Sequence, residues 1–199
     1  MIDINRNRIF IRFQGEIIMK QFVSITLIVL LVSACVPAQH KPSYQEFLMG
    51  GFNPEEWTVG NQASDQNQRI IEFVRSNENI DNWTELLTSQ IIRKPANVEP
   101  IDVFVASIHN KDRKLCPGGF KQKIIAHGQK TDTEEASIIY EWKINDCGAN
   151  ADQHEITKII YGKFSIFRLA YVERTKKLSN VKRQKWINSL KEAKIVVNR

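Results

Sequence analysis

The sequence predicts an α+β domain in which an antiparallel β-sheet carries packed helices, arranged like an α-β-α sandwich and closed by one disulfide. Within residues 135–145 apolar and polar side chains alternate, which is the period of a half-buried strand. The apolar segment 154–175 is too long for one ordinary strand, and Gly162-Lys163 near its middle predicts a hairpin turn or bulge. Residues 180–193 have an apolar stripe at helical spacing, formed by Val181, Trp186, Ile187 and Leu190. Strands joined mainly by short connections favour an antiparallel sheet with helices on it.

The remaining elements follow from local pattern, beginning near Trp57. Residues 69–74, RIIEFV, are rich in the residue types that favour strands. The next segment changes period, and Asp81 or Asn82 can cap a helix that ends at Pro95. The apolar face of this predicted helix comprises Trp83, Leu86, Leu87, Gln90 and Ile91.

A second helix is predicted over residues 99–115, where Ile101, Phe104, Val105 and Ile108 fall near helical spacing and CPGG stops the run. A strand is then expected from Phe120 in FKQKIIAHGQK. The predicted order is roughly β-β-α-α-β-β-β-β-α.

An export signal precedes the predicted domain. In MKQFVSITLIVLLVSAC, Lys20 supplies a basic residue, an apolar run follows over residues 22–32, and Ser33-Ala34 are small. The run is shorter than the roughly 20 apolar residues that a helix needs to cross a bilayer. VSAC resembles the lipobox of bacterial lipoproteins, in which the cysteine receives a diacylglycerol and becomes the first mature residue. The resemblance implies lipidation of Cys35.

These features divide the chain into four parts. Residues 1–18 are interpreted as a mis-called start extension, because the signal is complete from Met19. Residues 19–34 are the lipoprotein signal peptide. Residues 35–55, with several Pro and Gly among polar residues, are a flexible tether. Residues 56–199 form the single α+β domain. The expected location is the cell envelope, and Val36 after the lipidated cysteine favours the outer membrane, facing the periplasm, if the host is diderm.

The two further cysteines, Cys116 and Cys147, support export, because a pair left over in an oxidising compartment is best explained as a disulfide. The formal net charge is +6, and basic residues concentrate within residues 173–186. These residues form either a patch for anionic lipid or polyanions, or the solvated face of a helix, and the second interpretation is favoured. No nucleic-acid partner is expected for an exported protein.

Signs of catalytic chemistry are weak. His40, His109, His127 and His154 are far apart and show no metal-ligand spacing. The sequence contains no GxSxG elbow, phosphate-binding loop or dinucleotide fingerprint. We therefore expect no catalytic, cofactor-binding or metal-binding residues. The four tryptophans, Trp57, Trp83, Trp142 and Trp186, line either a ligand site or the core, and core is favoured.

Several segments together resemble an uncharacterised family of exported proteobacterial proteins. They are NIDNWTELLTSQ, CPGG, WKINDC, HEITKIIYGKFSIFRLAYVER and RQKWINSLKEA, which cover most of the chain from about residue 57. The element order is also similar to the Mog1/PsbP-like α-β-α sandwich, a fold used for binding and assembly. Neither resemblance supplies a catalytic motif, and a fold alone does not assign a function.

The leading hypothesis is a membrane-anchored lipoprotein with a non-enzymatic domain that binds an envelope protein or a small ligand. The first alternative is a component of a secretion or other envelope assembly system. The second is an envelope hydrolase that pairs His127 or His154 with a carboxylate.

Overall fold

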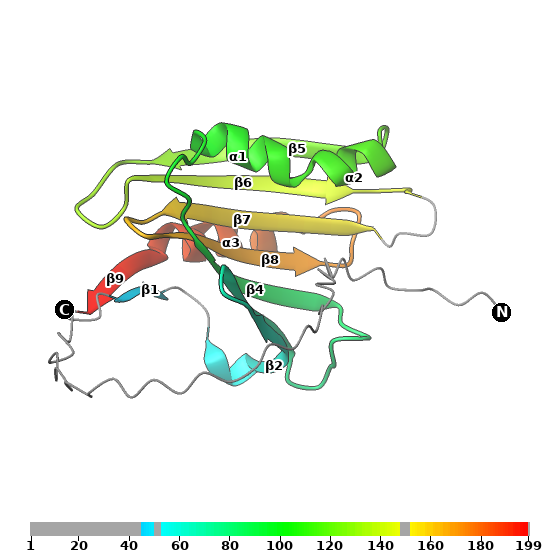
Figure 1. The fold of residues 1–199 in the computed structure, drawn as a ribbon. Helices are drawn as coiled ribbons and strands as arrows, with labels where there is room; N and C mark the ends of the chain where they lie inside the picture. The colour runs from blue at the N-terminus through cyan, green and yellow to red at the C-terminus, as the bar shows by residue number, and fades with distance from the viewer. Residues whose placement is uncertain (1–44, 50–52, 148–151, 199) are drawn as a thin grey trace, which may run out of the picture. The chain divides into compact units, whose positions relative to one another are not determined.

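A seven-stranded sheet, antiparallel throughout, forms the centre of the domain (Figure 1). The computed structural model describes residues 45–49, 53–147 and 152–198, all within one compact unit, His40–Arg199. The order across the sheet is β2-β3-β4-β8-β7-β6-β5. The strands are β2 (Trp57–Ser64), β3 (Gln68–Arg75), β4 (Glu85–Arg93), β5 (Phe120–Gly128), β6 (Ala136–Ile144), β7 (Gln153–Tyr161) and β8 (Ser165–Glu173).

Helices lie on both faces of this sheet, in agreement with the predicted α+β class, although the domain contains more strand than helix. On one face α1 (Ile101–Ile108) and α2 (Asn110–Leu115) lie over the β5–β6 side, and α3 (Asn180–Glu192) lies on the opposite face (Figure 1). A short 3-10 turn, Pro54–Glu56, precedes β2. Among the described helices none is long and apolar enough to span a bilayer.

Two main apolar clusters hold the helices to the sheet. Under α3, Trp186, Ile187 and Leu190 pack against alternate residues of the central strands. Under α1, Ile101 and Val105 pack against Ile138, Tyr140, Trp142 and neighbouring residues. β6 is a strand, as predicted, and the set Ile138, Tyr140 and Trp142 lies on one face, under α1. The strand is not half-buried, because Ile139 on the other face belongs to the cluster under α3.

The helix predicted to start at Asp81 or Asn82 is wrong, since Glu85–Arg93 is the strand β4 between β3 and β8. The consecutive residues Leu86, Leu87 and Thr88 are all buried, because both faces of β4 are covered. A strand buried on both faces loses the two-residue alternation, and its apolar residues here matched a helical spacing by coincidence.

The second predicted helix is present as two short helices that meet at His109. This side chain is buried, with Nδ1 3.1 Å from Asp112 Oδ2 and Nε2 3.2 Å from the Tyr140 hydroxyl. The strand from Phe120, the hairpin around Gly162-Lys163 and the C-terminal helix are confirmed. The predicted disulfide is also present, with the Cα atoms of Cys116 and Cys147 5.6 Å apart.

Two short strands were not predicted. β1 (Gln45–Met49) pairs antiparallel with β9 (Lys194–Asn198) in a separate two-stranded sheet. The Glu46 carboxylate accepts hydrogen bonds from the backbone N–H groups of Lys163 and Phe164 in the β7–β8 turn. Residues 45–49 therefore form paired structure inside the stretch expected to be a tether. Cys35 and the predicted signal peptide lie outside the described residues.

We expect Trp142→Ala to lower the free energy of unfolding by about 3–5 kcal/mol, because the change leaves a cavity beneath α1. Trp142 is 7% exposed and stacks against Phe120. Lys143→Ala, one residue along the same strand, is the matched control and should have a much smaller effect. Urea unfolding measures both. Equal loss of stability in the two variants would contradict the assignment of Trp142 to the core.

Candidate functional site

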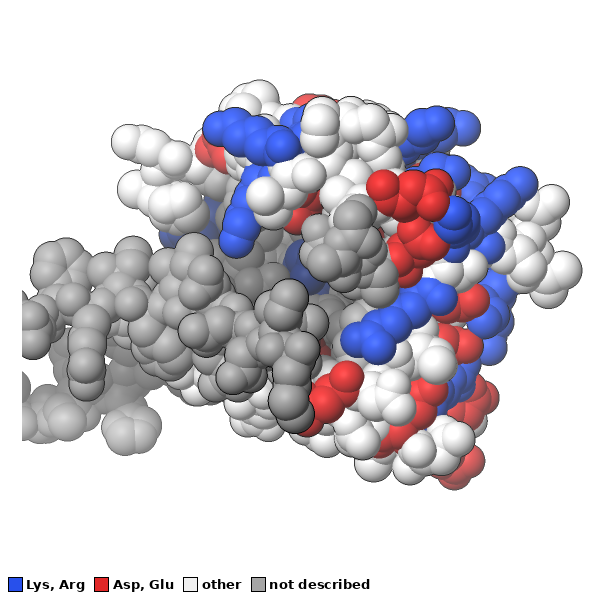
Figure 2. Space-filling view, turned by 90° about the vertical axis from the view of Figure 1, so that its right-hand side faces the viewer, with Lys and Arg blue, Asp and Glu red and all other residues white. Residues whose placement is uncertain are grey.

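Strand register aligns four polar residues in one row across the sheet. Lys121 of β5 lies opposite Lys143 of β6, which lies opposite His154 of β7, which in turn lies opposite Glu173 of β8. Residues directly opposite on neighbouring antiparallel strands have adjacent side chains. The row reaches β4, where Glu85 lies opposite Glu173. It crosses the end of the sheet where α3 begins, the end that Figure 2 faces.

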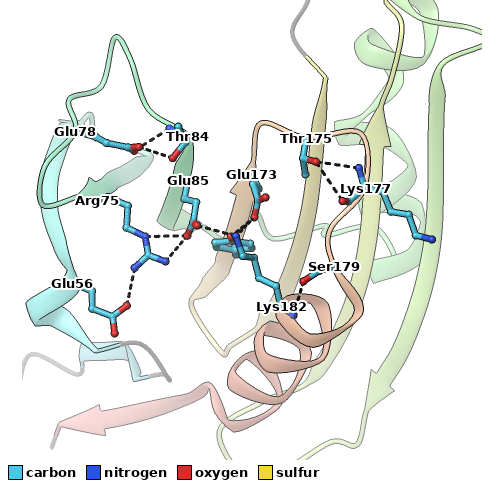
Figure 3. Close-up of polar contacts among 11 residues, drawn as sticks. Glu56, Arg75, Glu78, Thr84, Glu85, Glu173, Thr175, Lys177, Ser179 and Lys182 are labelled. Carbon is cyan, nitrogen blue, oxygen red and sulfur yellow. Dashed lines mark hydrogen bonds and ion pairs between the residues drawn. The ribbon is translucent and has the colours of Figure 1, made fainter.

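The acidic half of this row is balanced by cations (Figure 3). Lys182 Nζ lies 3.0 Å from Glu85 Oε1 and 2.6 Å from Glu173 Oε2, and Arg75 Nη2 lies 2.5 Å from Glu85 Oε2. The Tyr171 hydroxyl donates a 2.8 Å hydrogen bond to Glu173. Burial alone would raise the pKa of Glu85, but Lys182 and Arg75 hold that pKa below its usual value. Arg75 also pairs with Glu56, with Nη1 2.7 Å from Glu56 Oε2. This half therefore joins β3, β4 and β8 to α3 through paired charges.

The basic half surrounds a cavity of about 430 Å³. We call it the basic cavity, and its lining consists of Lys121, Gln122, Lys123, Glu141, Trp142, Lys143, His154, Lys177, Leu178, Asn180 and Arg183. Five of these side chains are cationic and only one is a carboxylate. Within the described ranges, the ammonium groups of the four lysines form no ion pair or hydrogen bond. In Figure 2 Lys and Arg side chains occupy much of the right-hand part of this end, with Asp and Glu among them.

Glu141, the one carboxylate in the lining of the basic cavity, is paired with Arg183, the one guanidinium there. Arg183 Nε donates a 2.6 Å hydrogen bond to Glu141 Oε2. Burial would raise the pKa of Glu141, but the hydrogen bond and charge of Arg183, with smaller contributions from His154 and Lys123, keep that pKa low. The carboxylate therefore stays ionised and neutralises Arg183, so the excess positive charge comes from the four lysines.

His154 forms the buried side of the cavity. Its Nδ1 accepts a 3.0 Å hydrogen bond from the Leu178 backbone N–H, and its Nε2 lies 3.7 Å from Glu141 Oε2. An Nδ1 that accepts a hydrogen bond carries no proton, so the neutral ring has its proton on Nε2, facing Glu141. Burial lowers the pKa of His154 against the opposing effect of Glu141. The ring is therefore neutral at neutral pH.

The other histidines that we considered lie apart from this site. His127 Nε2 is 3.7 Å from Asp102 Oδ1, and both side chains are more than half exposed. His109 is enclosed beneath α1 and α2, and His40 lies outside the described residues. The described part of the chain contains no group of three His, Cys, Asp or Glu residues that could hold a metal ion. The four tryptophans are between 5% and 9% exposed, as expected of core residues.

A second polar cluster lies on the opposite face of the sheet. Arg168 Nη2 is 2.7 Å from Glu155 Oε1, and Glu155 is 2% exposed. A cavity of about 370 Å³ borders Arg168, His109 and Asp112. Since the guanidinium and both ring nitrogens have partners, this cluster is satisfied internally and serves to fix α1 and α2 to the sheet.

We expect the stability of the protein to fall as the pH drops from 7 to about 5, partly through His154. The folded-state pKa of His154 is below the ordinary histidine value of 6.5, so the unfolded chain takes up this proton first. Acid therefore favours the unfolded state, and the stabilisation is present above pH 6.5 and lost below it.

His154→Asn should reduce this pH dependence, because the Asn oxygen can still accept the Leu178 N–H but does not titrate. Urea unfolding at pH 7, 6 and 5 measures the slope. His127→Asn is the control, since that imidazole is 55% exposed, and it should keep the wild-type slope. Identical slopes for His154→Asn and the wild type would contradict the neutral buried ring.

Comparison with known proteins supports the fold. No protein-family model matches the chain, and no curated protein matches it. Among solved structures, the chain is similar to the solution structure of cyanobacterial PsbP (CyanoP) from Synechocystis sp. PCC 6803. The TM-score is 0.52 at 11% sequence identity, over 77% of this chain and 92% of that chain. The domain therefore has a PsbP-like fold, as the order of its elements suggested.

Proposed function

We propose that the chain is a membrane-anchored bacterial lipoprotein whose domain binds an anionic partner in the cell envelope and catalyses no reaction. The observation that carries the proposal is the basic cavity, where five cationic side chains surround a single carboxylate. Like charges that converge without partners repel one another, and an anionic ligand relieves that repulsion. The PsbP-like fold supports a binding role by analogy only.

The anchor is proposed from the sequence. The apolar run of residues 22–32 leads into VSAC, which has the form of a lipobox, so we propose lipidation at Cys35. The disulfide fits an oxidising compartment. The proposed location is the envelope, at the outer membrane facing the periplasm in a diderm host. A role in a secretion or envelope assembly system remains compatible with such a binding domain.

A hydrolase is the second candidate, because His154 lies beside Glu141 in the lining of the basic cavity. The arrangement does not suit a general base. Nδ1 is occupied by the Leu178 N–H, and Nε2, which carries the proton, faces Glu141. The lining of the cavity includes no Ser, Thr or Cys that could act as a nucleophile. Binding therefore explains the site better than hydrolysis.

The anchor is tested with Cys35→Ala. Labelling the host with a radioactive fatty acid should mark the wild-type protein and leave the variant unmarked, because the thiol is the point of attachment. The variant should also remain an unprocessed precursor or become soluble. Equal labelling of both proteins would contradict the proposed anchor.

The binding role is tested by photo-cross-linking in the host, with a photoreactive residue in place of Asn180, an exposed residue in the lining of the cavity. The mass of the cross-linked chain reports whether the partner is a protein, a lipid or a small molecule. The adduct should disappear when Lys121 and Lys143 are both changed to Gln.

Lys111→Gln/Lys114→Gln in α2 is the matched control, because it removes the same charge from exposed positions outside the cavity. This control should keep the adduct. An adduct that both double variants retain, or no adduct at all, would contradict the proposed binding role.

A further inference from the structure

We infer that the anion bound by the basic cavity is a phosphate ester, held by Lys121, Lys143, Lys177 and Arg183. This inference rests on the proposed function, since it names the chemical class of the ligand for the same cavity. It follows from the number of cations, their origin in separate elements and the size of the space they surround.

The cations come from separate elements and meet at one place. Lys121 and Lys123 extend from β5, Lys143 from β6, Lys177 from the segment after β8, and Arg183 from α3. Lys121 and Lys143 lie directly opposite each other across the β5–β6 pair. Identical charges in directly opposed positions destabilise a sheet, so this pair imposes a local energetic cost in the unliganded protein. One bound anion between them would convert the repulsion into attraction.

A phosphate suits this arrangement better than a carboxylate does. A phosphate monoester carries about 1.5 to 2 negative charges near neutral pH and three strong acceptor oxygens on one tetrahedral group. Several ammonium groups approaching from different elements can each meet a different oxygen of that group. An acidic peptide instead spreads its single charges along an extended chain at about 3.3 Å per residue. The convergence of the lysines on a single cavity therefore favours one compact, multiply charged group.

Arg183 adds a preorganised donor. Its Nε is fixed by the 2.6 Å hydrogen bond to Glu141, which restrains the plane of the guanidinium. Within the described part of the chain, the two terminal nitrogens of Arg183 donate no hydrogen bond. These two nitrogens are available to ligand oxygens, in the bidentate geometry with which arginine binds phosphate.

The cavity also has room for the rest of an ester. Its volume of about 430 Å³ is within the usual range for small-molecule sites. Leu178 contributes apolar lining, and Asn180 contributes an uncharged polar group. A phosphate that carries a glycerol or sugar substituent meets these requirements. Such a group belongs either to a phospholipid headgroup or to a soluble phosphate ester, and the experiment distinguishes the two sources.

The experiment uses the full chain with Cys35→Ala, so that lipidation does not itself attach the protein to membranes. Calorimetric titration with glycerol 3-phosphate, at low ionic strength, tests the soluble ester. Sedimentation with phosphatidylcholine vesicles that contain phosphatidic acid, whose headgroup is a glycerol phosphate monoester, tests the lipid headgroup. Vesicles with an equal charge of oleic acid, and an oligo-glutamate peptide, provide carboxylate controls.

We expect one of the two phosphate probes to bind. The double variant Lys121→Gln/Lys143→Gln should weaken that binding roughly tenfold or more, and a tenfold weakening is a loss of about 1.4 kcal/mol of binding free energy. Lys111→Gln/Lys114→Gln removes the same charge outside the cavity and should change the affinity by less than about twofold. Binding of glycerol 3-phosphate with this dependence supports a soluble ester. Binding of phosphatidic acid vesicles alone, with the same dependence, supports a lipid headgroup.

Two results would overturn the inference and are distinguishable from each other. If the carboxylate probes bind with the same dependence on Lys121 and Lys143 and neither phosphate probe does, the ligand is not a phosphate ester, although the proposed function stands. If no probe responds to the cavity substitutions, or both double variants weaken binding equally, the cavity is not an anion site. In that case the proposed function fails as well.

Discussion

The hydrogen bond from the Leu178 N–H to His154 Nδ1 fixes where α3 begins, and the geometry of the whole site depends on that position. Leu178 is 1% exposed, so the bond lies in a dry interior where an unpaired backbone N–H would be costly. It directs the next turn of chain over β7. From there Lys182 reaches the carboxylates of β4 and β8, and Arg183 reaches the carboxylate of β6. Lys182 and Arg183 thus pair with these carboxylates, and the ammonium groups of Lys121, Lys123 and Lys143 form no ion pair among the described residues.

The other end of α3 is held by a buried lysine. Lys158 of β7 is 7% exposed and donates hydrogen bonds to the backbone carbonyls of Lys191 and Ala193, where the helix ends. A cation at this end satisfies carbonyls that the helix leaves unpaired and complements its dipole. Ser179 caps the start of the helix through a hydrogen bond from the Lys182 N–H. Both ends of α3 are therefore attached to the sheet, and Trp186 stacks on Tyr171 between them, which holds the helix in place beside the basic cavity.

The sequence predicted those elements in which apolar residues recur at a regular spacing. Ile138, Tyr140 and Trp142 recur at every second position, and Trp186, Ile187 and Leu190 recur at helical spacing, so β6 and α3 were predictable, although Ile139 is buried on the other face of β6. β4 was not, because burial of Leu86 and Leu87 on opposite faces removes the alternation. The basic cavity was missed for a different reason. Lys121, Lys143 and His154 are distant in sequence, and only strand register brings them together. The cluster within residues 173–186 gave a partial signal, since Lys177 and Arg183 line the cavity while Lys182 belongs to the balanced acidic half.

The protonation state of His154 tests this account most directly, because the bond from Leu178 requires an Nδ1 without a proton. Long-range ¹H–¹⁵N NMR spectra of the histidine rings distinguish the two neutral tautomers from the charged ring. At neutral pH we expect a neutral His154 with its proton on Nε2, and a Leu178 amide proton that exchanges slowly with solvent. A charged ring, or a neutral ring with its proton on Nδ1, would show that this hydrogen bond is absent. The position of α3, and the basic cavity beside it, would then need another explanation.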